Sequence, residues 1–439
     1  MAKKEFNKKV FMGKFLAILI LGIVLGISYL FSAQIESFLG IGKKASGFAT
    51  ATELQDSDLT VHYLDVGQGD STLILLPDET VMLIDAGTSN EGKKVVSYIK
   101  DLGISTIDYF IVTHSDSDHC GGAFRILDEF VVKNIYRPFQ IAVDDNGKAI
   151  KDDKGNLIEE LGYYLDVYSN ISKVDTDTYG KFIEYVYDEA EESDANVIVS
   201  HDGLTIHSKD VSKPFSFEFF APKVISTISV DTMKAPHTTG YPVKTYTGSD
   251  SHVKNSSSPI MLLEYNEKSF LFSGDATDDV ELDFVNSLEF DLDEKQRFID
   301  VDVFQAGHHG SNTSNTKELL ELTTPDFVVV SCGEGNDYGH PHTEFVDRVD
   351  SYSHSTNDYL LRTDISENIV FGFNTEGKLV YAAFTTGQGV TIYWYQIAIG
   401  LFVVLSITII CVKVTKNKKA TAKRFVKKTK QVSKVYKNR

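Results

Sequence analysis

Two uninterrupted apolar runs bracket this 439-residue chain, and they constrain its fold more than any other feature of the sequence. The first covers residues 15–33 and the second covers residues 391–412, and neither contains a charged side chain. About 20 apolar residues in a helix cross the hydrocarbon core of a bilayer. We therefore expect two transmembrane helices, with the residues between them folded on one side of the membrane.

The basic residues at the two ends predict which side that is. Residues 1–14 hold five lysines and one glutamate, and residues 413–439 hold 12 Lys and Arg residues and no acidic residue. Basic flanks mark the cytoplasmic ends of membrane spans, so we predict a cell-membrane protein with both termini in the cytoplasm and an extracellular middle. A second interpretation of residues 15–33 is a cleaved signal peptide, which exports the same residues. The basic tail is also a candidate partner for anionic lipid of the inner leaflet.

The region between the basic ends is strongly acidic, with 26 basic and 61 acidic residues. A surface this acidic excludes a broad electrostatic footprint for nucleic acid. A polyanionic substrate would therefore have to be held locally, through metal ions. The chain has only three cysteines, which excludes a disulfide scaffold.

Short β-branched and aromatic runs bounded by Gly, Pro and Asp predict strands along residues 58–388, after a polar linker at residues 34–57. In the first half the runs are LTVHYLDVG, STLILLP, VMLIDAG, IDYFIVTH and NIYRPF, with helices expected at residues 91–102 and 122–130. In the second half they are FSFEFFAP, PIMLLEY, SFLFSGD, VDVFQAG, DFVVVSCG and the pair around NIVFGFNTEGKLVYAAF, with a helix at NTKELLELT. This pattern predicts two sheets with helices outside, a layered α/β sandwich.

Residues 140–255 lie between the two halves and are long and polar. Long polar segments of this kind are often lids or recognition surfaces. We expect part of this segment to be ordinary fold and the rest to be an insertion that contributes to substrate specificity.

The segment THSDSDHCGG places four potential metal ligands within six residues, directly after a predicted strand. Imidazole and carboxylate together bind first-row divalent metals, and the high share of oxygen favours Mn²⁺ without excluding Zn²⁺. Further candidates stand at the ends of other predicted strands, at the edge where an α/β layer gathers its site. The four ligands of the segment are His114, Asp116, Asp118 and His119, and the further candidates are Asp70, Asp85, Asp275 and the pair His308 and His309.

Six motifs carry a resemblance to a known family: LDVGQGDSTLI, LIDAG, HSDSDHCGG, FLFSGDA, GHHGSNTS and YGHPH stand in this order along residues 59–384. HSDSDHCGG resembles the HxHxDH metal loop of the metallo-β-lactamase superfamily. The ordered set resembles the hydrolase domain of ComEC-type DNA-uptake channel proteins. The resemblance implies a four-layer αββα sandwich, here between two transmembrane helices. A channel of that type needs many membrane spans, so we expect a tethered hydrolase instead.

The resemblance also implies roles for individual residues. It implies ligand roles for the four residues of the HSDSDH loop, a metal-bridging role for Asp275 and a ligand role in the histidine pair, where we favour His308, with His309 lining the pocket. Asp116 departs from the superfamily pattern, which has a second histidine there. No motif identifies the remaining ligand of the superfamily, so one or two ions are possible; the candidates are His201, His207, His237 and His252.

The chemistry that follows is hydrolysis by a metal-activated water. Asp118 and Asp275 are the residues expected to hold that water and accept its proton. His340 and His342 in YGHPH are interpreted either as a substrate clamp or proton donor, or as loop histidines bonded to backbone. Asp70 and Asp85 are expected to support the site.

The leading functional hypothesis is an extracellular metal-dependent phosphodiesterase or nuclease acting on DNA or a wall polymer. An alternative is a cell-envelope esterase, because SNTSNTKELLELTTPDFVVVS resembles a region of exported phosphorylcholine esterases. Tyr163, Tyr164 and Tyr168 would then be candidates for a choline-binding aromatic cage. A third hypothesis is a non-enzymatic metal-binding sensor module on the same fold.

Overall fold

The structure is a computed structural model that describes residues 54, 57–139, 177–224, 238–239, 243–244, 246, 248–352 and 360–384. All of these belong to one compact unit, residues 45–386. Across these ranges no helix combines the length and the apolar character needed to cross a bilayer. Both predicted membrane spans, the basic tail, the three tyrosines of the predicted cage and His237 lie outside the described residues.

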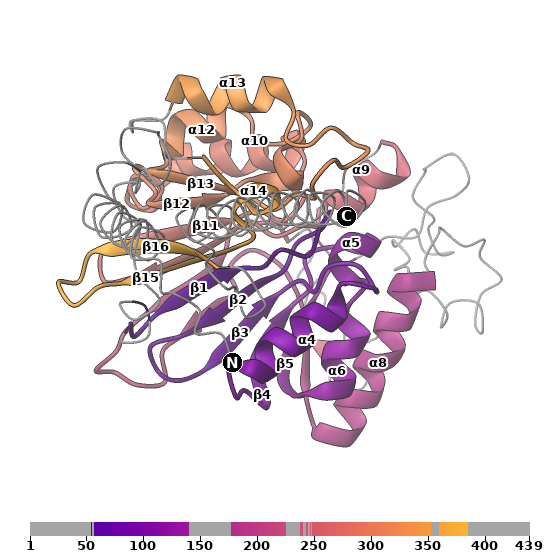
Figure 1. Ribbon diagram of the computed structural model, residues 1–439. Helices are drawn as coiled ribbons and strands as arrows, with labels where there is room; N and C mark the ends of the chain where they lie inside the picture. The colour runs from indigo at the N-terminus through magenta and orange to yellow at the C-terminus, as the bar shows by residue number, and fades with distance from the viewer. Residues whose placement is uncertain are drawn as a thin grey trace, which may run out of the picture. The chain divides into compact units, whose positions relative to one another are not determined.

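Within the described part of the chain, the first sheet has nine strands in the order β16-β15-β1-β2-β3-β4-β5-β6-β9. Strands β3 to β6 and β9 run parallel, whereas β15 pairs antiparallel with β1, so the chain returns to the sheet where it began (Figure 1). The strands are β1 (Thr60–Tyr63), β2 (Thr72–Leu75), β3 (Val81–Ile84), β4 (Thr106–Ile111), β5 (Val131–Arg137), β6 (Asn196–Val199), β9 (Thr238–Thr239), β15 (Asn368–Phe373) and β16 (Leu379–Phe384).

The second sheet has seven strands among the described residues, in the order β14-β13-β12-β11-β10-β8-β7. Strands β11 to β14 run parallel, and β10 and β11 form an antiparallel hairpin. The strands are β7 (Thr205–His207), β8 (Ser216–Phe219), β10 (Met261–Tyr265), β11 (Lys268–Phe272), β12 (Val303–Gln305), β13 (Phe327–Val330) and β14 (Leu360–Arg362).

Helices cover the outer face of each sheet. In Figure 1, α4 (Gly92–Asp101), α6 (Ala123–Glu129) and α8 (Asp177–Ser193) lie outside the first sheet, and α10 (Asp278–Ser287), α12 (Lys317–Thr323) and α13 (Thr343–Tyr352) lie outside the second. Shorter helical segments are α5 (Ser117–Cys120), α9 (Asp250–Asn255), α11 (Leu292–Gln296), α14 (Thr363–Ser366), η2 (Leu288–Phe290) and η3 (Gly307–Gly310). The predicted αββα sandwich is confirmed for this unit.

The alternation of side chains along the strands separates the interior into layers. On β10, Met261 and Leu263 belong to the core between the two sheets, whereas Leu262 packs into the core under the outer helices. On β11, Phe270 and Leu271 divide in the same way. Successive side chains of a strand point to opposite faces, so a continuous apolar run is what a sheet buried on both faces requires.

The described parts of residues 140–255 belong to the sandwich. Strand β6 continues the first sheet, and β7 and β8 form one edge of the second. Helix α8 buries a stripe of residues with helical spacing against the first sheet, a pattern typical of an amphipathic helix. The stripe consists of Tyr179, Phe182, Ile183, Val186 and Ala190.

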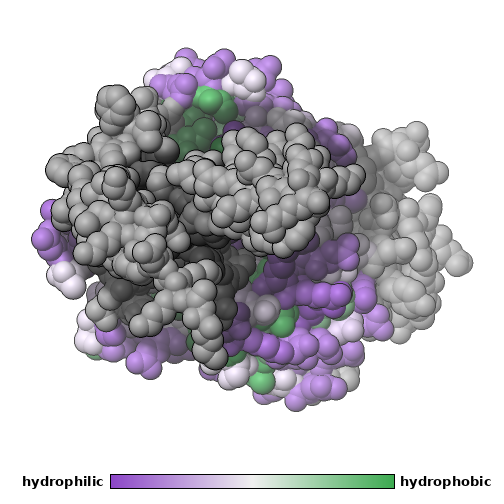
Figure 2. Space-filling view, in the orientation of Figure 1, coloured by the Kyte–Doolittle hydropathy of each residue, from purple (hydrophilic) through white to green (hydrophobic). Residues whose placement is uncertain are grey.

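The two cysteines among the described residues are both free and buried. Cys120 packs in the core under α4 and α6, and Cys332 packs under the helices of the second sheet. Burial raises the pKa of both thiols well above the usual value, so neither is a ready nucleophile. On the face seen in Figure 2, the described surface is mainly hydrophilic.

Candidate metal centre

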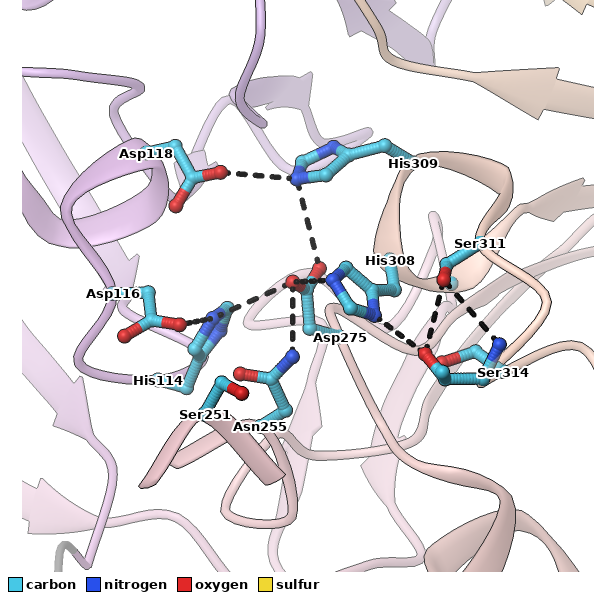
Figure 3. A network of polar contacts seen from close by, with 12 residues as sticks. His114, Asp116, Asp118, Ser251, Asn255, Asp275, His308, His309, Ser311 and Ser314 are labelled. Atoms are coloured by element: carbon cyan, nitrogen blue, oxygen red, sulfur yellow. Dashed lines mark hydrogen bonds and ion pairs between the residues drawn. The ribbon is translucent and has the colours of Figure 1, made fainter. Parts of the chain in front are cut away.

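The site forms where the carboxyl ends of the parallel strands of both sheets meet. Asp85 follows β3, His114 lies three residues after β4, and Asp275 lies three residues after β11. His308 and His309 follow β12 within η3. Figure 3 shows His114, Asp275 and the histidine pair pointing toward one another from the two halves of the sandwich. The strand-end positions in the sequence therefore predicted their convergence correctly.

A buried group of two carboxylates and two imidazoles, which we call the metal group, forms the centre of this site. One potential ligand atom from each of Asp70, His119, Asp275 and His309 lies within 4.8 Å of all the others. The His119 Nε2 atom is 3.1 Å from Asp275 Oδ1 and 3.3 Å from His309 Nε2. Asp118 adds its Oδ2 atom at 3.3 Å from His309 Nε2. Carboxylate and imidazole atoms converging at this spacing are the donor set of a divalent metal site.

Asp275 presents its second oxygen to a neighbouring group of polar atoms. Asp275 Oδ2 is 3.6 Å from His114 Nε2 and 3.6 Å from His308 Nε2. Asp116 Oδ2 in turn is 3.9 Å from His114 Nε2 (Figure 3). The two oxygens of Asp275 thus face two sets of atoms, which is the arrangement that a bridging carboxylate needs.

Several buried polar atoms of the site lack a hydrogen-bond partner among the described residues. These are His114 Nε2, Asp275 Oδ1 and both carboxylate oxygens of Asp70. Buried polar atoms without partners destabilise a fold, and native proteins satisfy almost all of them. A cation held by Asp70 and Asp275 would satisfy their carboxylate oxygens, so the residues present fit a divalent metal ion.

Asp85 orients His119. Its Oδ2 atom lies 2.8 Å from His119 Nδ1, and its oxygens accept hydrogen bonds from the backbone N–H and the hydroxyl of Thr113 at 2.8 Å and 2.7 Å. Asp85 has φ +56°, a left-handed backbone conformation that is unfavourable for a residue with a side chain. These contacts hold Asp85 in that conformation and leave His119 Nε2 directed at the metal group.

The histidine pair is held by the loop that follows it. His308 and His309 both have left-handed backbones, with φ +50° and +55°. The His309 Nδ1–H donates to Ser331 O at 3.0 Å, which aims Nε2 at the metal group. Asn315 accepts a hydrogen bond from Gly307 N–H and donates to Gly307 O, both at 2.8 Å, which closes the loop around the pair.

His309, and not His308, joins the buried group. We predicted His308 as the ligand, but the two adjacent left-handed residues turn their side chains in different directions, and only His309 lies in the group. The His309 side chain is 1% exposed, whereas that of His308 is 26% exposed and contacts the Thr313 hydroxyl at 3.0 Å. Asp70, expected to be a supporting residue, also lies within the group. The ligand roles themselves stay predictions.

The charges of the site shift its pKa values strongly. Burial opposes a charge on His119 and on His309, but the surrounding carboxylates, Asp275 first, raise the pKa of both imidazoles well above the usual value. Burial and the neighbouring His119 lower the pKa of His114 to about 3. Burial would raise the pKa of Asp118, but the hydrogen bond to His309 and the charge of His119 lower it. A divalent cation would replace the protons on the imidazoles, so metal binding should release protons.

Two glycines allow the loops to come this close. A Cβ atom on Gly122 would lie 2.1 Å from Ala86 O, and one on Gly69 would lie 2.4 Å from Asp118 O. The Gly-Gly pair after His119 therefore lets α5 pack against the loop after β3. Gly69 brings Asp70 next to the loop that carries Asp118.

His340 and His342 occupy different positions at the rim of the site. Gln68 accepts from Gly333 N–H through Oε1 and so turns its amide nitrogen toward His340 Nδ1, at 3.3 Å. Because that nitrogen is a donor, His340 Nδ1 accepts and the ring proton lies on Nε2. His342 uses both ring nitrogens for backbone contacts, 3.0 Å from Asn312 N and 3.2 Å from Tyr338 O. The backbone-bonded interpretation therefore describes His342.

None of the described candidates for a further histidine ligand reaches the metal group. His201 contacts Asp202 O through Nδ1 at 2.7 Å, His207 is exposed on β7, and His252 Nε2 lies 3.3 Å from Asp279. Two residues that we did not predict stand at the site instead, Lys254 and Asn255 at the end of α9. They occur in the run HVKNSSSP, which has no motif that could have identified them.

Comparisons with known proteins give a family match over part of the chain and several curated relatives. Residues 64–156 match the family described as the Metallo-beta-lactamase superfamily. ComE operon protein 3 of Bacillus subtilis (strain 168) is 25% identical over 351 residues, 76% of this chain and 35% of that protein. Recombination protein 2 of Haemophilus influenzae is 23% identical over 346 residues, 78% of this chain and 32% of that protein. The chain spans about a third of the length of these curated relatives.

Solved structures give distant matches. The metallo-beta-lactamase fold protein YhfI from Bacillus subtilis matches with a TM-score of 0.35 at 8% identity, over 74% of this chain and all of that chain. CmlA, a diiron beta-hydroxylase from Streptomyces venezuelae, matches with a TM-score of 0.40 at 14% identity, over 72% of this chain and 54% of that chain.

Proposed function

We propose metal-dependent hydrolysis of phosphodiester bonds for this chain, which carries a metallo-β-lactamase superfamily domain and is similar to ComEC-type proteins. The observation that carries the proposal is the buried group of Asp70, His119, Asp275 and His309, with Asp118 beside it. A divalent cation bound there supplies Lewis acidity, which favours deprotonation of water at neutral pH and polarises a phosphoryl oxygen.

The residues of the chain have separate tasks in this reaction. Asp118 is 28% exposed in its side chain, in contrast to the buried His309 that it contacts, so it reaches both the metal group and solvent. It is ionised at neutral pH, because its pKa is lowered, and is placed to orient a water and accept its proton. His119 and Asp275 would hold the cation, and Asp85 fixes the orientation of His119.

His340 is the candidate donor to the leaving oxygen. Its ring centroid lies 5.5 Å from that of His308 and 5.9 Å from that of His309. Burial and the neighbouring His309 lower its pKa to about 4, so it is neutral at pH 7. The free Nε2–H can then donate a hydrogen bond to an oxygen on which negative charge develops.

Nucleic acid is the substrate class that the relatives favour, because the name of one of them, Recombination protein 2, refers to recombination. The acidity of the chain means that a DNA backbone would be held at the metal group and not over a wide basic surface. The predicted spans at residues 15–33 and 391–412 would keep this reaction at the outer face of the cell membrane.

The test uses purified full-length protein, first stripped with a chelator and then supplied with Mn²⁺ or Zn²⁺. Hydrolysis of bis(p-nitrophenyl) phosphate and of single-stranded DNA should return with metal. Asp118→Ala and His119→Ala should each lower the rate about 100-fold or more. The matched control Asp350→Ala, on the exposed face of α13, should retain the activity of the unaltered protein.

Three outcomes separate the functional hypotheses. Equal trace activity in the unaltered protein and in both variants would contradict the proposal. Release of phosphorylcholine from wall polymer without cleavage of DNA would instead identify the esterase. Stoichiometric metal binding with no hydrolysis of any phosphoester would indicate a binding module.

A further inference from the structure

A buried lysine stands beside the second set of polar atoms in the site. Lys254, near the end of α9, has a side chain only 9% exposed, and its Nζ atom lies 3.4 Å from Asp116 Oδ1. Lysine is rarely buried, because removing its ammonium group from water is unfavourable unless an anion compensates. Asp116 is such an anion, and it occupies the position where the superfamily pattern has a histidine.

Asn255 completes this arrangement. Its amide nitrogen lies 3.5 Å from Asp275 Oδ2, and with the carboxamide rotated by 180° the nitrogen would instead donate to Asp116 Oδ2 at 3.2 Å and to Ser251 O at 2.8 Å (Figure 3). In either orientation, α9 directs hydrogen-bond donors at the carboxylates on the His114 side of the site. A metal site would require electron-pair donors at the same place.

We propose that the Lys254 ammonium takes the place of a second metal ion, so that the chain binds one divalent ion, in the group that contains His119 and His309. An ion bound to Asp116 Oδ1 at the usual 2.0–2.2 Å would lie at most about 5.6 Å from the ammonium, which is 3.4 Å from the same oxygen, and the two positive charges would repel. The group around His119 and His309 has no lysine or arginine within ion-pair distance among the described residues.

An ammonium group in place of a second metal ion would also act on the substrate, an inference that rests on the proposed function. In a two-ion site, the second ion stabilises negative charge on an oxygen of the reacting phosphate. The Lys254 ammonium, held by Asp116, places a positive charge and N–H donors on the side of Asp275 that faces His114. Lys254 would thereby bind a phosphoryl oxygen of the substrate. The number of bound metal ions can be measured without any substrate, so it tests the role of Lys254 separately from the proposed hydrolysis.

The test counts metal ions without substrate. Full-length protein is equilibrated with Mn²⁺, freed of unbound ion and analysed for metal per chain, with electron paramagnetic resonance to distinguish single Mn²⁺ ions from coupled pairs. The unaltered protein should hold one ion with an uncoupled spectrum. Lys254→Met should bind a second ion at least about tenfold more tightly than the unaltered protein and show a coupled spectrum.

Two control variants isolate the charge. Lys254→Arg keeps the positive charge and should stay at one ion. Lys244→Met removes a lysine that pairs with Asp283 outside the metal group and should also stay at one ion. Two ions in the unaltered protein, or one ion in a folded Lys254→Met variant, would overturn the inference. If Lys254→Met fails to fold, the count in the unaltered protein still decides.

Discussion

Asp85 shows how a residue outside the metal group can control it. It is 1% exposed, contacts His119 Nδ1, and is itself held by two hydrogen bonds from Thr113. Asp85→Asn keeps the shape but removes the charge that favours an N–H at Nδ1 and a free Nε2. We expect the metal affinity to fall about 10- to 100-fold, as when such partners are removed in other metal sites.

Competition with a fluorescent chelator measures this loss of affinity directly. Asp350→Asn on α13 is the matched control, because it makes the same chemical change at an exposed position. Equal metal affinities for the Asp85→Asn variant and the unaltered protein would show that Asp85 does not orient His119.

Single residues also show where sequence reasoning reached its limit. We expected the ligands to gather at the carboxyl ends of parallel strands, because such strands of one layer end at the same edge. His114, His119 and Asp275 do come together at that edge. It could not choose between His308 and His309, since the direction of each side chain depends on two left-handed backbone conformations. Lys254 could not be found, because only the folded position of α9 brings it to Asp116.

At the scale of elements, the loop after β12 depends on a buried carboxylate. Glu281 on α10 is fully buried and accepts hydrogen bonds from the backbone N–H groups of Asn315 and Thr316 at 2.7 Å and 2.6 Å. Asn315 in turn binds Gly307, at the start of η3. Glu281 therefore supports the position of His309 through one intermediate residue.

Glu281 should also give stability a measurable pH dependence. Burial raises its pKa from 4.5 to about 7, so the folded chain retains this proton over a range where the unfolded chain has lost it. Its contribution to the free energy of unfolding is complete below pH 4.5 and is lost as the pH rises to about 7. The change is at most about 3 kcal/mol.

Urea unfolding at pH 5 and pH 7.5 tests this dependence by comparing the unaltered protein with Glu281→Gln. The glutamine cannot ionise, so the variant should lack this part of the pH dependence, and the difference in unfolding free energy between the two proteins should change between the two pH values. A difference that stays constant would mean that Glu281 does not titrate in this range.

Elements were predicted best where a strand ends in a turn residue. The β10–β11 hairpin has two left-handed residues, Asn266 and Glu267, between strands that the pattern PIMLLEY–NEK–SFLFSGD already delimits. Strand β5 begins at Val131, earlier than the run NIYRPF indicated, because its first part alternates between exposed and buried positions. The order of strands within each sheet could not be read from the sequence, since β15 pairs with β1 across some 300 residues.

On the scale of the whole unit, the metal group joins the two halves of the sandwich. Asp70 and His119 come from loops of the first sheet, and Asp275 and His309 come from loops of the second. Without a cation, protons on His119 and His309 balance the charge of these carboxylates. A divalent ion that binds only the folded chain should raise the unfolding free energy by about 2.7 kcal/mol at 100 times its Kd.

Thermal unfolding with and without a chelator measures this stabilisation. Chelation should lower the Tm of the unaltered protein and leave the Tm of His309→Ala unchanged, because that variant lacks a member of the group. The same shift in both proteins would place the stabilising ion elsewhere.

The most direct test of the metal centre is anomalous diffraction from crystals grown with Mn²⁺, collected on both sides of the metal absorption edge. We expect one strong anomalous peak among Asp118, His119, Asp275 and His309, and no peak beside Asp116. An absence of any peak at this group, or a peak only at a distant surface site, would contradict the assignment of a metal centre to this chain.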